Sequence, residues 1–257
     1  MNISFTGKTV MVTGAGAGIG AVTAKDFGSL GANVAVVDMN IDAARATSLE
    51  INANGGMSEA FACDISDETQ VANTIASIVK RFGSLDCAFN NAGIGPDGVR
   101  IPYGALTETD SSTWRKICDV NLTGTFLCLK HELIQMKRQG GGSIVNAASI
   151  GGVRMAPNFG AYGPSKAGVI ALTELAALES ASSGIRVNVV APGPCDNTTL
   201  MANTLATDPG QDKALEEHVI PLHKLAQPQD ISRAVVWLCS DLSGHTPRDH
   251  KRKNKQI

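Results

Sequence analysis

The sequence is poor in aromatic residues and carries no strong charge of either sign. Phe, Trp and Tyr make up 4% of the 257 residues, which argues against the aromatic platforms on which single-stranded nucleic acids stack. The formal net charge is −2, so no general basic field attracts nucleic acid or a membrane surface. There is no apolar run of about 18 residues, and the N-terminus lacks the basic, apolar and small-residue order of a signal peptide. We therefore expect a cytoplasmic protein that binds neither nucleic acid nor membrane.

The sequence also lacks the cysteine spacing of metal sites and redox motifs. None of its six cysteines belongs to a C-x-x-C pair or stands at zinc-ligand spacing from histidine: Cys63, Cys87, Cys118, Cys128, Cys195 and Cys239. We interpret them as reduced thiols and expect no metal site. Cys195 lies in a predicted substrate loop, but no histidine stands near it in sequence to activate it as a nucleophile.

What the sequence does contain is a regular alternation of short apolar runs and longer helical patterns. The apolar runs are nearly continuous and rich in Val and Ile, which is typical of strands covered on both faces; they lie at residues 8–13, 33–38, 57–62, 85–90, 142–148 and 185–191. Helical patterns occupy residues 19–30, 41–52, 68–82, 111–138, 161–182 and 229–239. The alternation predicts an α/β domain over residues 1–241, a doubly wound parallel sheet with helices on both faces.

Two segments of this pattern call for a separate interpretation. Residues 111–138 are long enough for two helices that meet near residues 118–121. Residues 192–221 mix Pro, Asn, Thr and Asp with a helical patch, and we predict that they form a mobile lid over a site. In open parallel sheets, ligands bind beyond the carboxyl ends of the strands.

A glycine-rich turn follows the first predicted strand and opens the first helix. It contains Gly14, Gly16, Gly18, Ile19 and Gly20. Glycines let the backbone approach a pyrophosphate, and the helix N-terminus supplies free N–H groups and a positive dipole end. The strand–turn–helix setting therefore predicts a dinucleotide site.

Acidic residues close the second and third predicted strands. Asp38 is placed to accept hydrogen bonds from the adenosine ribose, and a 2′-phosphate there would be repelled. No cation stands nearby, since Met39 and Asn40 follow, so we predict NAD in preference to NADP. Asp38 also suits a helix cap, although Asn40 is better placed. Asp64 has two interpretations, contact with the adenine amino group or a helix cap, and Asp67 is the better cap.

The segment Tyr162–Lys166 (YGPSK) carries the chemistry. Tyr162 and Lys166 stand at i and i+4 of a predicted helix and share one face, where an ammonium favours the ionised phenol. A free tyrosine, with a pKa of about 10, is otherwise a poor base near neutral pH. Ser149, at the end of the preceding strand, is placed to hold a substrate oxygen. Together they predict proton transfer to and from an alcohol or carbonyl oxygen.

Taken together, these residues resemble the short-chain dehydrogenase/reductase family over residues 6–241. The resemblance is carried by TGAGAGIG (13–20), Asp38, CDI (63–65), NNAG (90–93), VNLTG (120–124), Ser149, YGPSK (162–166) and PG (192–193). It implies a Rossmann-type fold, in which Tyr162 is the acid/base and Ser149 orients the substrate oxygen. Lys166 then holds the nicotinamide ribose and depresses the tyrosine pKa.

Further roles follow from the same resemblance. Asn121 would support a water-filled proton path behind the lysine, although from the residues alone it also suits a helix kink that bonds local backbone. Asn90, Ala92 and Gly93 would steady the sheet and line the adenosine ribose, and Pro192, Gly193 and Thr198 would surround the nicotinamide amide. The neighbouring Met39, Ile65 and Cys195 complete the predicted cofactor-binding set.

The C-terminal segment departs from the family. The family usually adds a seventh strand after residue 241, whereas residues 242–257 carry five basic residues and one acid with little that is apolar. We predict a basic disordered tail and no seventh strand. Because that strand usually contributes to subunit contacts, a tetramer is in doubt, and we expect a homodimer through residues 111–138 and 161–182.

The predicted pocket is mostly apolar or small and shows no obvious arginine clamp: Ile150, Gly151, Met155, Phe159, Pro194, Cys195 and Leu200, with residues 95–103 as a further wall. We predict a neutral secondary alcohol or ketone, cyclic or a diol. One alternative is a 3-oxoacyl-carrier reductase, disfavoured because such reductases usually take NADPH. The other is a nucleotide-binding protein with little turnover, against which the intact Ser149, Tyr162 and Lys166 argue.

Overall fold

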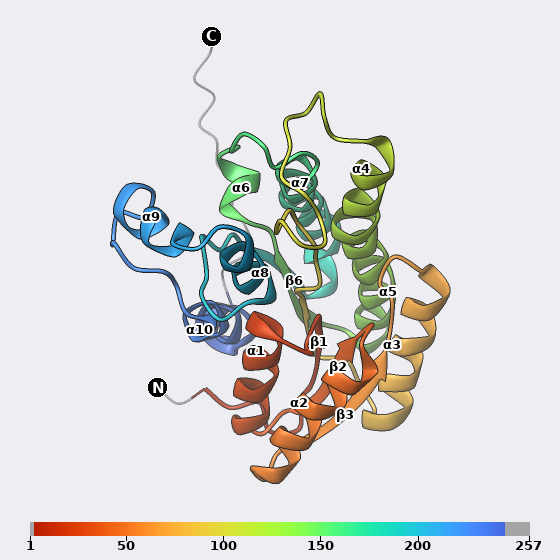
Figure 1. Ribbon diagram of the computed structural model, residues 1–257. Helices are drawn as coiled ribbons and strands as arrows, with labels where there is room; N and C mark the ends of the chain where they lie inside the picture. The colour runs from red at the N-terminus through yellow and green to blue at the C-terminus, as the bar shows by residue number, and fades with distance from the viewer. Residues whose placement is uncertain (1–2, 245–257) are drawn as a thin grey trace.

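The computed structural model describes residues 3–244, which form a single twisted parallel sheet between two layers of helices (Figure 1). The six strands stand in the order β3-β2-β1-β4-β5-β6. Their bounds are β1 Thr9–Thr13, β2 Asn33–Asp38, β3 Met57–Ala62, β4 Cys87–Asn90, β5 Gly142–Ala147 and β6 Ile185–Val190. Every pairing is parallel, so all strands point their carboxyl ends to the same edge. The predicted α/β doubly wound sheet is confirmed.

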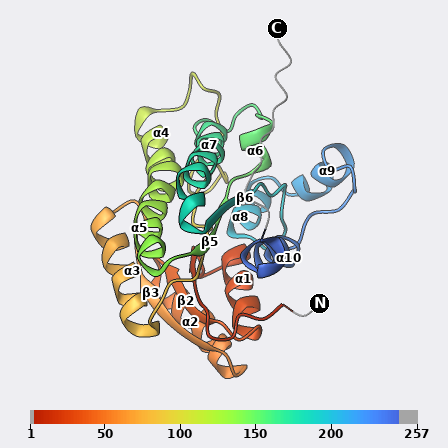
Figure 2. The same ribbon diagram turned by 180° about the vertical axis from the view of Figure 1, so that it is seen from behind.

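The helices divide between the two faces of the sheet, as the views from the front and from behind show (Figures 1 and 2). One face packs against α1 (Gly18–Ser29), α2 (Ile41–Ala53) and α10 (Pro228–Cys239), with Phe27 and Val235 fully buried there. The other packs against α3 (Glu68–Phe82), α5 (Gly124–Gln139) and α7 (Tyr162–Ser180), with Ile78 and Leu129 in its core. Burial on both faces explains the continuous apolar strands.

The long predicted helix over residues 111–138 is interrupted. It divides into α4 (Ser111–Cys118), a π-helical turn η1 (Asp119–Thr123) and α5. The interruption lies where the sequence predicted two helices to meet. Single π-turns within α-helices are frequent at functional sites.

The remaining elements lie around the carboxyl edge of the sheet and at its far end. The four-residue helix α6 (Ile150–Val153) was not predicted, and the predicted lid contains α8 (Thr199–Thr207) and α9 (Gln211–His218). Two 3₁₀ turns, η2 (Ala181–Ser183) and η3 (Asp241–Ser243), complete the described chain. Within residues 3–244, no helix is both long and apolar enough to cross a membrane.

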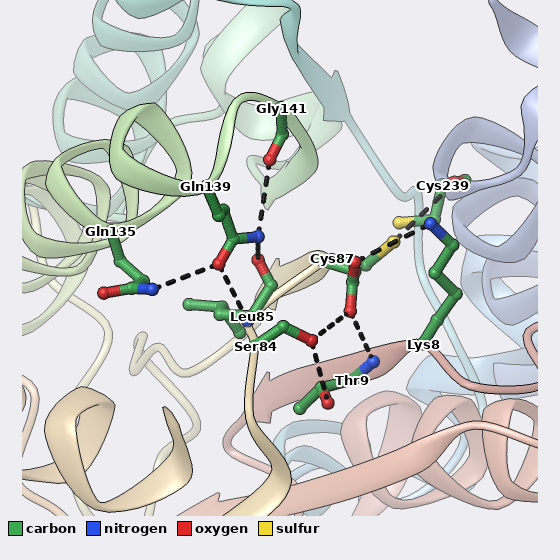
Figure 3. Close-up of polar contacts among 10 residues, drawn as sticks. Lys8, Thr9, Ser84, Leu85, Cys87, Gln135, Gln139, Gly141 and Cys239 are labelled. Atoms are coloured by element: carbon green, nitrogen blue, oxygen red, sulfur yellow. Dashed lines mark hydrogen bonds and ion pairs between the residues drawn. The ribbon is translucent and has the colours of Figure 1, made fainter. Parts of the chain in front are cut away.

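Polar contacts anchor the amino ends of the central strands, on the side away from the predicted site (Figure 3). The Gln139 amide donates a 2.7 Å hydrogen bond to the Leu85 carbonyl and accepts one of 3.2 Å from the Leu85 N–H. The Cys87 thiol on β4 donates to the Cys239 carbonyl over 3.7 Å, which ties α10 to the sheet. These contacts fix β4, whose carboxyl end carries predicted site residues.

In the part of the chain that the structure describes, β6 is an edge strand with β5 as its neighbour. The Arg186 guanidinium on β6 donates to the carbonyls of Leu238 (2.7 Å) and Ser240 (3.2 Å) at the end of α10. The tail predicted to be disordered starts at residue 242. Its first two residues, Leu242 and Ser243, instead belong to the 3₁₀ turn η3. Residues 245–257, most of that tail, lie outside the described residues.

Candidate active site

The carboxyl end of β5 and the start of α7 bring Ser149 and Tyr162 together. Ser149 follows β5 and caps α6, its hydroxyl accepting a 3.1 Å hydrogen bond from the Gly151 N–H. Tyr162, the first residue of α7, lies beside this serine: a methyl group built on Gly151 would lie 3.5 Å from the Ser149 Oγ and 3.6 Å from the Tyr162 ring. The helix α6, absent from the sequence prediction, thus holds the serine in place. Two hydroxyls are left side by side at the sheet edge.

Lys166 lies one turn further along α7 and is buried, with 5% of its surface exposed. Its Nζ donates a 2.8 Å hydrogen bond to the Ala147 carbonyl at the end of β5. Burial lowers the pKa of Lys166 to about 8, because the charged ammonium loses hydration. The ammonium is therefore held by backbone of the sheet on the predicted face of the helix.

The expected depression of the Tyr162 pKa by Lys166 is not what the structure shows. Burial raises the pKa of Tyr162, and the hydrogen bond with Ser149 lowers it by a smaller amount. The Lys166 ammonium is directed to the Ala147 carbonyl, its hydrogen-bond acceptor at 2.8 Å. The sequence showed the shared helical face but not the cost of placing both groups out of water.

The turn after β4 runs beside both of these α7 residues. A methyl group at Gly93 would lie 3.1 Å from the Lys166 Nζ and 3.2 Å from the Asn121 Oδ1, and one at Gly95 would lie 2.8 Å from the Tyr162 ring. Neither position has room for a side chain without moving a site residue. The turn is thus a wall of the site, built from glycines so that the ammonium and the phenol fit.

Asn121 sits in the π-helical turn and is fully buried. Its amide accepts from the Ile94 N–H and donates to the Ile94 carbonyl, both at 2.8 Å, and also donates to the Ser165 hydroxyl at 3.1 Å. Asn121 thus lies at a helix irregularity as expected, but the backbone that it bonds is distant in sequence and not local; its Oδ1 also lies beside Gly93 next to Lys166. The proton-path role stays a prediction.

The glycine-rich turn forms a bare helix N-terminus. Ala17, the N-cap of α1, makes no side-chain cap, and the first turn of α1 has no acidic residue. In contrast, α2 and α3 are capped by Asn40 and Asp67, as predicted. The N–H groups at the start of α1 thus lack a side-chain acceptor, and they fit the pyrophosphate of a dinucleotide.

Close packing explains why this turn needs glycine. A methyl group at Gly14, where φ is +62°, would lie 2.8 Å from the Ala92 Cα, and one at Gly16 would lie 2.9 Å from the Asp38 Oδ2. Asp38 binds the turn directly, because its Oδ2 accepts a 2.9 Å hydrogen bond from the Gly16 N–H. Its Oδ1 accepts a further hydrogen bond from the Asn40 N–H. A carboxylate thus stands beside the glycine turn, and a cavity of about 410 Å³ adjoins Gly16, Ala17 and Gly18.

Comparison with known proteins agrees with this geometry. The sequence model of the family described as Enoyl-(Acyl carrier protein) reductase matches residues 14–246. A 2,5-dichloro-2,5-cyclohexadiene-1,4-diol dehydrogenase of Sphingobium indicum is 39% identical over 237 residues, covering 92% of this chain and 91% of the relative. The crystal structure of levodione reductase is similar with a TM-score of 0.86 at 34% identity and covers 94% of each chain. That of NAD⁺-bound xylitol dehydrogenase has a TM-score of 0.85 at 33% identity, covering 93% of this chain and 95% of the other.

The chain belongs to the short-chain dehydrogenase/reductase family. The predicted resemblance and the predicted enzyme class are confirmed: the protein is an oxidoreductase of a secondary alcohol or ketone that uses a nicotinamide cofactor. Within residues 3–244, no three His, Cys, Asp or Glu side chains are grouped closely enough to hold a metal ion.

The NNAG segment divides between two roles. Asn90 is buried, and its amide donates to Glu132 and Asn146, so its side chain steadies the sheet and leaves only its backbone for a cofactor. Asn91, which the prediction omitted, donates to the carbonyls of Thr13 (3.1 Å) and Gly14 (3.2 Å) and so locks the glycine turn. The repeated asparagine was the signal that pointed to it.

Two of the predicted adenosine contacts have local structural roles as well. The Asp64 carboxylate accepts from the N–H and hydroxyl of Ser66, both within 2.9 Å. The Ile65 side chain is buried and packs near Gly124, so its contribution to a site is confined to the backbone. Met39 is 75% exposed and lies next to Asp38 at the rim.

The segment after β6 contacts the site both near Ser149 and near the glycine-rich turn. The Pro192 carbonyl accepts a 2.9 Å hydrogen bond from the Ile150 N–H, directly after Ser149, and no group lies within 4 Å of a methyl group built on Gly193. Thr198 caps α8 and its Cα lies 3.5 Å from a methyl group built on Gly18. Cys195 was predicted to line the pocket, but its side chain lies in the core instead. Burial there raises the pKa of its thiol to about 12.

The predicted substrate wall is aromatic and tethered to the lid. Phe159 contacts Tyr103 with ring centroids 5.5 Å apart and Tyr162 with centroids 6.2 Å apart. Tyr103 shares a 2.8 Å hydrogen bond with Thr204 on α8. A methyl group built on Gly151, also predicted, would lie 3.6 Å from the Tyr162 ring. By contrast, Ile150 and Met155 are largely exposed.

Proposed function

We propose that the protein transfers a hydride between NAD(H) and a neutral, ring-shaped secondary alcohol or its ketone, with Tyr162 as acid/base. The observation that carries this proposal is that the Ser149 hydroxyl and the Tyr162 ring lie next to the same point at Gly151, 3.5 Å and 3.6 Å from a methyl group built there, in a site that also holds the buried Lys166. Two hydroxyls side by side suit one alcohol or carbonyl oxygen. The remaining site residues surround this pair.

The proton moves through this chain's own residues. In the direction of oxidation, Tyr162 takes the proton of the substrate hydroxyl while Ser149 holds the substrate oxygen. In reduction, Tyr162 returns that proton. The buried Lys166 ammonium, one turn along α7 from Tyr162, would hold the nicotinamide ribose, and Asn121 beside Gly93 supports the lysine side of the path. A bound nicotinamide supplies the hydride exchange.

NAD(H) is the proposed cofactor. The Asp38 carboxylate is fixed at the glycine turn by the Gly16 N–H, where it would accept from ribose hydroxyls and repel a 2′-phosphate. The following residues Met39 and Asn40 offer no cation. The similarity to NAD⁺-bound xylitol dehydrogenase is consistent with this choice.

The substrate class rests on the wall of the pocket. Phe159 and Tyr103 present apolar rings next to Tyr162. The similar Sphingobium enzyme is named for a cyclohexadiene diol, which supports a six-membered ring as the substrate frame. A carrier-linked 3-oxoacyl substrate is the alternative; the matching family model is described for enoyl substrates on acyl carrier protein, which shares the carrier but not the ketone.

The oligomer and the compartment are further parts of the proposal. Apolar side chains stand exposed on α5 and α7, among them Phe126, Ile134 and Leu178, and we propose that they form a homodimer interface. All six cysteines are unpaired, which is consistent with a reducing cytoplasm.

The test is a matrix of initial rates with wild-type protein. Cyclohexanol and cyclohexane-1,4-diol are oxidised with NAD⁺ or NADP⁺, and an acetoacetyl thioester is reduced with NADH or NADPH. The proposal expects turnover of the ring alcohols with NAD⁺ and a lower kcat/KM with NADP⁺. Turnover confined to the thioester with NADPH would contradict the proposal and show that the protein is a carrier-linked reductase. Absence of any turnover by folded protein would favour a protein that only binds nucleotide.

A further inference from the structure

Glu132 on α5 is a fully buried acid that no catalytic or cofactor role accounts for. It lies beneath the carboxyl ends of β4 and β5, in the layer between the sheet and helices α5 and α7. Within residues 3–244, no Lys, Arg or His is within ion-pair distance of its carboxyl group. An ionised carboxylate in that position would lack both water and a counter-charge.

A chain of side-chain amides connects this acid to the catalytic helix. The Asn90 Nδ2 donates to the Glu132 Oε2 at 2.9 Å and to the Asn146 Oδ1 at 3.0 Å. The Asn146 Nδ2 then donates to the Thr173 hydroxyl at 2.9 Å, and that hydroxyl donates to the Val169 carbonyl on α7. Asn90 donates on both sides, to Glu132 and to Asn146, and from Asn146 onward each donor points toward α7.

Two atoms of the hydrogen-bonded pair Glu132 and Asn90 have no hydrogen-bond partner among the described residues. The Glu132 Oε1 and the Asn90 Oδ1 are both buried and unpaired. They are the second oxygens of the carboxyl and carboxamide groups that the Asn90 Nδ2 already joins. As acceptors they cannot bond each other unless one carries a proton, and leaving both unpaired in the protein interior is unfavourable. A proton on the Glu132 Oε1 satisfies both atoms at once.

We propose that Glu132 is a neutral carboxylic acid that closes a two-bond ring with Asn90 and thereby positions the carboxyl ends of β4 and β5. In this ring the Glu132 Oε1–H donates to the Asn90 Oδ1 while the Asn90 Nδ2 donates to the Glu132 Oε2. Glu132 is then a positioning residue, because it touches neither substrate nor cofactor.

The surroundings of the carboxyl group favour the neutral form. Burial raises the pKa of Glu132 to about 8, opposed by the smaller effect of the Asn90 hydrogen bond. The titratable groups nearby are the thiols of Cys128 on α5 and Cys63 after β3, and burial raises the pKa of each. From β4, β5 and α7 the facing groups are Asn90, Asn146 and Thr173, all uncharged. No neighbouring cation holds the acid ionised.

The ring affects the site through the residues that follow Asn146 and Asn90 in the sequence. Asn146 precedes Ala147, whose carbonyl accepts the hydrogen bond of the Lys166 ammonium. Asn90 precedes Asn91, which holds the glycine turn through the Thr13 and Gly14 carbonyls. Loss of the ring would therefore loosen Lys166 and the turn together. This catalytic consequence rests on the proposed function, whereas the protonation of Glu132 does not.

The first experiment compares wild-type protein with Glu132→Gln and with the control Glu179→Gln, which changes an exposed glutamate on α7. Infrared difference spectra are recorded on protein labelled with ¹³C at glutamate side-chain carboxyls, at pH 6.5. The proposal expects a protonated carboxyl band that is present in wild type and in E179Q and absent in E132Q. A wild-type spectrum with carboxylate bands alone would overturn it, and this readout needs neither turnover nor a folded variant.

The second experiment measures melting temperature between pH 5 and pH 8. The folded state keeps the Glu132 proton until the pH nears 8 while the unfolded state releases it above about pH 4.5, so wild-type stability falls as the pH rises from 5 to 8. Glutamine reproduces the donor and acceptor of the neutral acid. The melting temperature of E132Q relative to wild type should thus rise with pH, while the E179Q difference stays flat. A constant or falling E132Q difference would show that the folded protein holds an ionised carboxylate.

The positioning role of Glu132 is tested by measuring the catalytic rates of variants. With an alcohol that the wild type oxidises, E132Q should retain kcat within about threefold, whereas Glu132→Ala should lose at least about tenfold in kcat with little change in KM for NAD⁺. Rescue by glutamine but not alanine supports the ring, and equal loss in both variants overturns it. If wild type oxidises no alcohol, the proposed function fails, while the spectra and melting curves still decide the state of Glu132.

Discussion

The Asn203 amide on α8 donates a 2.8 Å hydrogen bond to the fully buried Asp97 carboxylate, which joins the lid to the turn after β4. Burial disfavours ionisation of Asp97, but hydrogen bonds from Asn203, Arg100 and the backbone outweigh it and hold its pKa well below the usual range. The Tyr103 to Thr204 hydrogen bond lies beside it. The predicted lid is thus held by two neighbouring polar contacts against the predicted wall of the substrate pocket.

Replacing Asn203 with alanine should weaken substrate binding. The variant removes one hydrogen bond to a charged group, a loss of about 1.5–3 kcal/mol, so we expect KM for the alcohol to rise at least about tenfold. The control is Lys213→Ala on the exposed part of α9, which should leave KM unchanged. Equal KM values for both variants, measured by initial rates, would show that the contact does not hold the lid.

Replacing Asp38 with serine should reduce the preference for NAD⁺ over NADP⁺. The change removes the carboxylate that faces the ribose while leaving a small acceptor for the Gly16 N–H. We expect the ratio of kcat/KM values for the two cofactors to fall by about tenfold or more. Glu50→Gln, a surface change near the same cavity, is the matched control. An unaltered ratio would mean that Asp38 does not select the cofactor.

Replacing Lys166 with methionine should stabilise the fold while abolishing activity. Burial lowers the folded-state pKa of Lys166 to about 8 from 10.5, so the unfolded state binds more protons between these values. The penalty for burying the charge, on the order of 3 kcal/mol, is full below pH 8 and fades as the pH rises toward 10.5.

The measurement for this prediction is chemical denaturation of wild type and K166M at pH 7 and at pH 10. The stability advantage of K166M should be larger at pH 7 than at pH 10. An advantage that grows with pH would contradict a lowered lysine pKa, and loss of stability at both values would show that the Nζ to Ala147 hydrogen bond outweighs the burial cost.

Much of the fold follows from short-range patterns in the sequence. Strands such as Asn33–Asp38 and helices such as Glu68–Phe82 were predicted at their observed bounds because apolar runs, capping residues and glycines mark their ends. Ser149, Tyr162 and Asp38 were predicted as site residues because each stands at the end of a strand or the start of a helix. Such positions are readable from local spacing alone.

The remaining features depend on contacts between distant segments. The π-helical turn forms where Asn121 bonds the backbone of Ile94, and no local signal predicts that contact. Glu132 occupies a helical position like any surface glutamate, and its burial beside Asn90 comes only from the packing of α5 on the sheet. The raised pKa of Tyr162 likewise reflects burial, which the order of residues does not reveal.

The central claim is that Tyr162 transfers the substrate proton, and Tyr162→Phe tests it most directly because only the phenolic oxygen is removed. Alcohol oxidation with NAD⁺ and NADH binding by fluorescence titration are measured on the same preparations of wild type and Y162F. We predict that kcat falls by about 10³-fold or more while the Kd for NADH stays within about threefold. A Y162F variant that oxidises the alcohol at the wild-type rate would contradict the account.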